Sequence, residues 1–239
     1  MTVHAQLVRV GRLKGAGIIK RASKHNLREI AREIGGYGGI DGRRVLLNQV
    51  LRGATTAEGV AAAAAELLKQ VKTTIRKDAV ICIEVLFSLR PGSQVNQQAF
   101  FADSLAWIDA YFKVPVVSAV VHNDEGAPHL HVLIVPLVDG CMRGSDLVSS
   151  RYKLIALHAD FHEVVGKPHG MILVKSRKPS KSNPRVPKEA GKEKTNSMSL
   201  LGFDQPPALT KHQRLELLTW QFTAGIQQKL ARGSHRWSH

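Results

Sequence analysis

The chain has 239 residues, and it is poor in cysteine, in aromatic residues and in acidic residues. Its two cysteines, Cys82 and Cys141, are too few for a disulfide framework and show no CxxC spacing, which is typical of a reducing cytoplasm. The sequence holds no run of about 18 apolar residues, so it predicts no membrane span. Because the first residues lack a basic segment followed by an apolar one, no signal peptide is expected and the predicted location is the cytoplasm.

The shortage of acidic residues leaves the chain strongly basic. There are 19 Asp and Glu against 34 Lys and Arg, so the formal net charge is +15 and the isoelectric point is near 10.2. A surplus of that size favours a polyanionic partner, which can be nucleic acid, an anionic membrane surface or a ribosome. Of these three, nucleic acid is the partner that the charge favours most.

The periodicity of apolar residues predicts an α+β fold, with a mainly antiparallel sheet, over residues 1–174. Runs of apolar and β-branched residues predict strands at 2–9, 79–89, 116–122 and 129–137. Helical spacing and capping residues predict helices at 23–34, from 55 to about 77, after Asn96, and at about 150–165. A Gly-rich loop is expected at 35–42. The last two strands are separated by six polar residues, so they are expected to lie side by side, as a hairpin or as neighbouring strands.

The composition changes after about Val174. Residues 175–210 are basic, rich in Pro and Ser, and almost free of large apolar residues, so a disordered linker is expected there. Residues 211–239 are predicted to form one further helix and a tail. The basic charges of this extension either contact phosphates or are simply solvated, and the sequence leaves both interpretations open.

The most informative stretch is HNDEGAPHLH, residues 122–131. Side chains alternate along a strand, so His129 and His131 are expected on one face, about 7 Å apart. His122 closes the preceding strand, and pairing of the two strands would bring all three imidazoles to one edge of the sheet. Three nitrogen ligands that leave positions open for solvent or substrate are typical of a catalytic metal site.

Three acidic residues are candidates for supporting this site. Asp124 and Glu125 lie beside the histidines, where either can orient a ligand imidazole or act as a general base. Glu84 is the one charge in the apolar strand 79–89, so it either points at the site or pairs with a cation. Imidazole ligands suit Mn²⁺, Co²⁺, Ni²⁺ and Zn²⁺ better than Mg²⁺.

Two residues are candidates for a nucleophile in phosphodiester chemistry. His25 stands at the expected start of the helix 23–34, where free N–H groups attract a phosphate, and Arg28 one turn later can hold phosphate oxygens in a bidentate fork. Tyr37 in the Gly-rich loop is the rival nucleophile. Each of these residues, taken alone, is more often an ordinary surface residue.

The stretch 122–131 resembles the His-x-Asp-Glu-x-x-Pro-His-x-His motif of the Mob/Pre plasmid mobilisation and recombination proteins, the MobV relaxases of the HUH endonuclease superfamily. The pattern Arg9-x₄-Lys14 followed by His25-Asn26-x-Arg28 is similar to the N-terminal motif of that family. The segment 161–171, FHEVVGKPHGM, is also in the style of the family. Together the resemblance covers about residues 5–175.

The resemblance implies an antiparallel sheet flanked by helices, with the HxH strand near its centre. It also implies an enzyme that nicks one strand at the transfer origin of a bacterial mobile element with Mn²⁺ or Mg²⁺, stays attached to the 5′ phosphate, and later reseals the strand. By the same resemblance the metal ligands are His122, His129 and His131. The acid beside the metal would be Glu125, the nucleophile His25, and the DNA contacts Arg9, Lys14 and Arg28.

The partners implied by the resemblance are the hairpin and the single-stranded nick site of a transfer origin, with a second copy of the chain and a conjugation coupling protein as further possibilities. Two alternative functions are kept. The three histidines also allow a metal-dependent hydrolase of small phosphoesters, which leaves the charge unexplained. A non-catalytic, origin-binding autoregulator would explain the charge but would make no use of the metal site.

Overall fold

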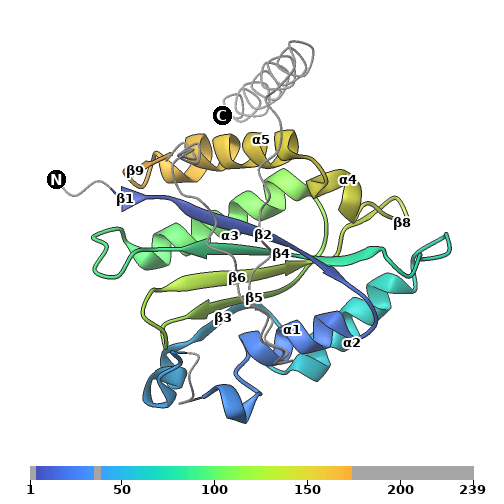
Figure 1. The fold of residues 1–239 in the computed structure, drawn as a ribbon, viewed down its shortest axis with the longest axis horizontal. Coiled ribbons are helices and arrows are strands. Elements are labelled where there is room, and N and C mark those ends of the chain that lie inside the picture. Colours follow the sequence, from blue (N-terminus) through green and yellow to red (C-terminus); the bar gives the residue numbers. More distant parts are fainter. Residues whose placement is uncertain (1–3, 35–38, 174–239) are drawn as a thin grey trace, which may run out of the picture. The chain divides into compact units, whose positions relative to one another are not determined.

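The computed structural model describes residues 4–34 and 39–173, and their centre is a five-stranded antiparallel sheet (Figure 1). The strand order is β2-β4-β6-β5-β3. The strands, in that order, are Leu7–Lys14, Val80–Ser88, His129–Ile134, Val116–His122 and Gln49–Gly53. The HxH strand β6 is therefore the central strand. It forms the expected hairpin with β5, in a register that places His122 opposite His129.

One face of the sheet carries the larger core. It is covered by α3 (Gln97–Phe112), α4 (Gly144–Val148) and α5 (Arg151–Phe161), which continues as the π-helical turn η3 (His162–Gly166). The buried aromatic residues of this core are Phe87, Phe100, Phe101, Trp107, Phe112 and Phe161. Strand β4 contributes every second side chain to it, because neighbouring residues of a strand point to opposite faces. This core packs against the face of β4 and β6 opposite the histidine side chains and so fixes the position of both strands.

The opposite face is only partly covered by helices. There, α1 (Ile18–Asn26) and α2 (Ala57–Leu68) pack together over a small apolar cluster that includes Cys82 and Leu133. Figure 1 shows these two helices apart from α3, α4 and α5. Towards the other end of this face Leu7 and Arg9 are exposed. The histidine strands therefore present one end to solvent.

Most expected elements are present, and the α+β fold class is confirmed. The strands 79–89, 116–122 and 129–137 correspond to β4, β5 and β6. The side chain of Asn96 caps α3, as expected, by accepting a hydrogen bond from the backbone N–H of Ala99 at 3.1 Å. The short strand β1 (His4–Ala5) was expected only as part of a longer strand, and it pairs in parallel with β9 (Met171–Ile172).

The N-terminal elements differ from the expectation. The first long strand, β2, continues through Gly11 to Lys14, and Gly11 pairs with Glu84 of β4. The first helix spans 18–26 and not 23–34. It begins directly after Gly17, which has a left-handed φ of 67°, and it ends before Arg28, whose φ is 57°. A left-handed residue cannot continue an α-helix, so the apolar periodicity at 27–34 does not form one.

Two further boundaries were wrong, and several short elements were not predicted. Helix α2 ends at Leu68 and not near 77, and its cap is Thr56, which accepts from the N–H of Gly59. The unpredicted elements are α4, β3, β9, η1 (Ala31–Glu33), η2 (Gly42–Leu47), and the pair β7 (Leu137–Val138) and β8 (Cys141–Met142). Within the described ranges, no helix is both long and apolar enough to cross a bilayer. The expected linker 175–210 and the helix and tail 211–239 lie outside the described residues.

Edge strand β3 depends on a glycine. Gly53 has a φ of 92°, and a Cβ there would press against the carbonyl oxygen of Val117 on β5. We expect Gly53→Ala to lower the free energy of unfolding by about 2 kcal/mol or more, because it combines backbone strain with a steric clash. Urea unfolding measures this change. Gly126→Ala is the matched control, since a Cβ at Gly126 meets nothing within 4 Å, and equal stability of the two variants would contradict the prediction.

Candidate metal centre and active site

The pairing of β5 with β6 brings three histidine rings together at one end of the sheet. His122 is the last residue of β5, and His129 and His131 are the first and third residues of β6. Their ring centroids lie 4.7 to 5.0 Å apart. One nitrogen from each ring falls in a group whose members are all within 4.8 Å of one another. Three nitrogens at that separation can bind one divalent cation.

The second nitrogen of each ring is hydrogen-bonded to an oxygen. The acceptors are the backbone oxygen of Asn26 for Nε2 of His122 (2.6 Å), the backbone oxygen of Ala127 for Nδ1 of His129 (2.7 Å), and Oε1 of Glu84 for Nδ1 of His131 (2.9 Å). Each of these oxygens can only accept, so each ring nitrogen that faces it must carry the proton. The remaining nitrogens, Nδ1 of His122 and Nε2 of His129 and His131, then carry the lone pairs that a metal ligand needs, and Nδ1 of His122 also lies 3.0 Å from Nη2 of Arg28.

The protonation state of the rings also fits a metal site. Burial, followed by repulsion from His131, lowers the pKa of His122 to about 2. Burial likewise lowers the pKa of His129. Rings that resist protonation keep their lone pairs at neutral pH, as metal ligation requires. A donor set of three imidazoles therefore fits a divalent transition-metal cation.

Glu84 points at the site. Its Oε1 accepts from His131 and, at 3.3 Å, from the side-chain amide of Asn26. Burial raises the pKa of Glu84, but the hydrogen bonds from His131 and Asn26 and the electrostatic influence of His131 and His25 together outweigh it, and the pKa is lowered overall. The sequence left open whether Glu84 points at the site or pairs with a cation. The structure favours the first possibility, because the carboxylate contacts His131.

Arg28 is placed differently from the expectation of a DNA contact. Its side chain is only 2% exposed, and its guanidinium is turned inward. Nε and Nη2 donate to the two oxygens of Asp124 at 2.8 Å each, and Nη2 also donates to Oε1 of Glu125 at 2.6 Å. The same Nη2 lies 3.0 Å from Nδ1 of His122. With its donors used inside the protein, Arg28 holds the acidic loop against β5 and does not reach a phosphate at the surface.

Asp124 is fully buried and contacts no imidazole through a hydrogen bond. Besides Arg28, it accepts from the side-chain amide of Asn48 at 2.7 Å. Burial raises the pKa of Asp124, but the bonds from Arg28 and Asn48 prevail and lower it to about 2. The expectation that Asp124 orients a ligand imidazole is therefore not met, because this carboxylate orients Arg28.

His25 faces the histidine cluster from α1. Its ring centroid lies 6.4 Å from that of His122 and 6.1 Å from that of His131, with the rings edge to face. The prediction of a helix N-terminus at His25 is wrong, because α1 ends one residue later and a helix C-terminus carries partial negative charge. The end of α1 near His25 therefore does not attract a phosphate. His25 nevertheless lies beside the histidine cluster.

Glu33 is a site residue that the sequence did not indicate. Its Oε2 lies 2.8 Å from Nδ1 of His25, whose side chain is 43% exposed. The carboxylate can only accept, so Nδ1 of His25 donates and Nε2 is left free. The backbone turns at Arg28, whose φ is 57°, between these two residues, so no helix or strand periodicity could have pointed to this pair.

Arg9 and Lys14 both lie on the edge strand β2 and are exposed. Arg9 is opposite Leu86, which is itself opposite His131, so Arg9 is on the face of the sheet that carries the histidines. Two strand spacings separate Arg9 from His131, roughly 10 Å. Lys14 lies five residues further along β2, roughly 17 Å from Arg9 and away from the cluster. Tyr37 lies outside the described residues.

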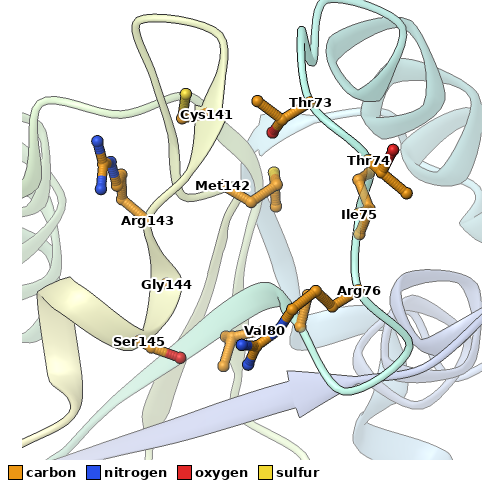
Figure 2. A pocket seen from close by; sticks show the side chains of 11 residues that line it. Thr73, Thr74, Ile75, Arg76, Val80, Cys141, Met142, Arg143, Gly144 and Ser145 are labelled. Atoms are coloured by element: carbon orange, nitrogen blue, oxygen red, sulfur yellow. The ribbon is translucent and has the colours of Figure 1, made fainter.

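One cavity lies away from the histidines. It measures about 360 Å³ and lies beside Val80, at the opposite end of β4 from Ser88, which pairs with His129 (Figure 2). Figure 2 shows side chains of 73–76 on one side and of 141–145 on the other. The residues that line it include Cys141 but no His, Asp or Glu, so none of the candidate acid–base residues lies there.

The sequence as a whole matches one family model. The model described as "Plasmid recombination enzyme" covers residues 3–185. The chain belongs to this family, Mob/Pre. A Mob/Pre relative, "Plasmid recombination enzyme type 2" of Staphylococcus aureus (strain N315), is 35% identical over 114 residues, which are 43% of this chain and 26% of the relative. The "Plasmid recombination enzyme" of Bacillus thuringiensis is 29% identical over 102 residues, which are 40% of this chain and 23% of that protein.

Solved structures of a Mob/Pre protein share the fold. The MobM relaxase domain, described as Mn-bound and bound to plasmid pMV158 oriT DNA, matches with a TM-score of 0.62 and 23% identity over 76% of this chain and 95% of that domain. A second structure of the MobM domain, bound to a 26-nucleotide oriT DNA, matches with a TM-score of 0.54. The match to the curated relatives covers only about a quarter of their length, and it is the relaxase-domain fold that this chain shares with MobM.

Proposed function

We propose that this chain is a metal-dependent relaxase, which nicks one DNA strand at a transfer origin, remains joined to the 5′ phosphate and later reseals the strand. The observation that carries the proposal is the arrangement of four histidines. One nitrogen from each of three rings lies within 4.8 Å of the other two, and the ring centroid of His25 stands about 6 Å from those of His122 and His131. The Mob/Pre family, and the DNA and manganese in the description of MobM, support it.

The metal would be held by His122, His129 and His131, with Mn²⁺ favoured over Mg²⁺ by the nitrogen ligands. When bound, a divalent cation acts as a Lewis acid that polarises a phosphate oxygen and neutralises its charge. Glu84 keeps His131 in the ligating tautomer. Glu125, fixed by Arg28, is the carboxylate beside the metal position, with Oε1 3.9 Å from Nε2 of His129.

His25 would be the nucleophile. Its free Nε2 attacks phosphorus, a nitrogen–phosphorus bond forms, and the bond from phosphorus to the 3′ oxygen breaks, so that the leaving strand ends in a 3′ hydroxyl after protonation. Attack of that hydroxyl on the phosphoramidate reverses each step and reseals the strand. Glu33 accepts a hydrogen bond from Nδ1–H of His25. Its carboxylate can stabilise the positive charge that the ring gains during attack.

The DNA would approach over the open end of the histidine face. Arg9 is exposed on that face and is better placed than Lys14. The net charge of +15 favours such a partner. A hairpin contact, a second copy of the chain and a coupling protein stay predictions.

The proposal is tested with single-stranded DNA from the transfer origin beside the chain's own gene, labelled on the 3′ side of the nick. We expect a protein–DNA band that resists denaturation in Mn²⁺ and is absent in EDTA. The double variant His129→Ala/His131→Ala should lose the band and also the rise in melting temperature on adding Mn²⁺, because ligand binding to the folded state stabilises it. His169→Ala, at a histidine that bonds Asp103 away from the cluster, is the control.

Other results would favour the alternative functions. Cleaved DNA without a covalent band indicates a hydrolytic nuclease. Metal-independent DNA binding without cleavage in any divalent metal indicates an origin-binding protein without relaxase activity.

A further inference from the structure

An exposed apolar strip lies on η2 and β3. It consists of Leu46, Leu47, Val50 and Leu51, which are 94%, 53%, 38% and 39% exposed. Half of the exposed large hydrophobic residues in the described part of the chain are in this strip. Strand β3 is an edge strand, so its outer side has no neighbouring strand in the sheet. Several exposed apolar residues in one short segment are typical of a binding site.

The strip is fastened to the loop that carries the acidic residues of the candidate active site. Five hydrogen bonds join residues 41–48 to residues 123–125. They are Asp41 N to Asp124 O (2.8 Å), Asn48 Nδ2 to Asp124 Oδ2 (2.7 Å), Asn123 N to Asn48 Oδ1 (2.7 Å), Asn123 Nδ2 to Leu47 O (2.9 Å) and Arg44 Nη1 to Glu125 O (3.5 Å). A ligand on the strip is thus held at a fixed distance from His122 and Glu125.

Positive charge accompanies the apolar residues. Arg43 and Arg44 precede Leu46 by three and two residues, and both are exposed. The guanidinium of Arg43 is shared with Asp41, and this weak surface pair does not prevent contact with a phosphate. Apolar surface for bases next to cations for the backbone is the combination that binds single-stranded nucleic acid. An apolar partner protein would not require the arginines.

We infer that the strip binds the bases of single-stranded DNA next to the scissile phosphate, while Arg43 and Arg44 contact its backbone. This inference rests on the proposed function for the identity of the ligand. Leu46 is the residue that projects furthest into solvent, and a leucine can wedge against or between bases that have lost their stacking partner. The strip would hold the strand unpaired and in register with His25.

The test separates base contacts from phosphate contacts. Fluorescence anisotropy in EDTA, where no cleavage occurs, compares a short oligothymidylate with an abasic oligonucleotide of the same length and charge. We expect the wild type to prefer the oligothymidylate, and the double variant Leu46→Ser/Leu47→Ser to lose at least about fivefold of its affinity for it while binding the abasic strand unchanged. Ile155→Ser, at an exposed apolar residue of α5, is the matched control and should keep the preference.

Three outcomes would overturn the inference. They are a wild type without preference for bases, a strip variant that keeps the preference, and a strip variant that changes only the oligomeric state in sedimentation velocity, which would make the strip a contact between two copies. The covalent-adduct assay is independent of this test. If the strip variant loses the base preference but the wild type forms no adduct, the strip is a DNA site and the relaxase proposal is rejected. If the wild type forms the adduct but the strip variant keeps the base preference, the relaxase proposal stands and the strip is rejected as a DNA site.

Discussion

Replacing Arg28 with methionine is expected to lower the free energy of unfolding by about 3–5 kcal/mol, because it leaves buried negative charge without its partner. Asp124 is fully buried and loses two hydrogen bonds of 2.8 Å, and Glu125 loses one of 2.6 Å. Methionine keeps most of the side-chain volume, so the loss of charge and hydrogen bonds dominates over a cavity. Urea unfolding followed by circular dichroism measures the change.

Arg52→Met is the matched control for this prediction. Arg52 also makes two hydrogen bonds to one carboxylate, that of Asp109, at 2.6 and 2.8 Å. The two side chains are 41% and 44% exposed, and such surface pairs contribute about 1 kcal/mol or less. If both variants lose the same small amount of stability, the buried network around Arg28 does not hold the acidic loop as the structure indicates.

The metal-site geometry was accessible from the sequence because it depends on short-range patterns. His129 and His131 share a face through the two-residue period of a strand, and six polar residues between two apolar runs predict that these runs pair. Once β5 and β6 pair, the position of His122 follows. The alternation of side chains along a strand also puts Glu84 on the same face as Cys82 and Leu86. Only the structure shows that Glu84 reaches His131.

The surroundings of the nucleophile candidate were not accessible, because they depend on contacts distant in sequence. The apolar spacing from Leu27 to Ile34 is helical, yet the chain turns at Arg28 into a left-handed conformation. The partners that hold Arg28 there, Asp124 and Glu125, lie 96 and 97 residues away. Tertiary contacts of this kind override local helix propensity. The same turn brings Glu33 back to His25. It also ends α1 early, which is why the local pattern gave the wrong helix end.

Edge strand β3 and the segment before it show a second reason. All five residues of β3 are exposed, so it has no alternation of buried and exposed positions by which a strand is recognised. Its place in the sheet comes from the pairing with β5, which includes an irregularity between Val50 and Arg52. Segments that are positioned by their neighbours and expose apolar side chains are therefore missed by periodicity, although they are candidates for binding.

His25→Ala is expected to reduce the rate of covalent adduct formation by about 10³-fold or more, because it removes the attacking nitrogen. The other three histidines of the cluster are the proposed metal ligands, so they cannot replace it as nucleophile. Tyr37→Phe is expected to leave the adduct intact. Affinity for the uncleaved strand in EDTA and the rise in melting temperature with Mn²⁺ should be those of the wild type in both variants. Loss of the adduct only in Tyr37→Phe would transfer the role of nucleophile to the tyrosine.

The orientation of His25 provides a finer measurement of the same role. Glu33→Ala should slow adduct formation by about 10²-fold, because Nδ1 no longer has an acceptor and the ring can populate the tautomer whose Nε2 carries the proton. Glu33→Gln keeps an acceptor oxygen and should retain more activity than Glu33→Ala. Nitrogen-15 NMR of the imidazole reports the tautomer directly, so a ring with unchanged tautomer and unchanged rate in Glu33→Ala would show that Glu33 does not position His25.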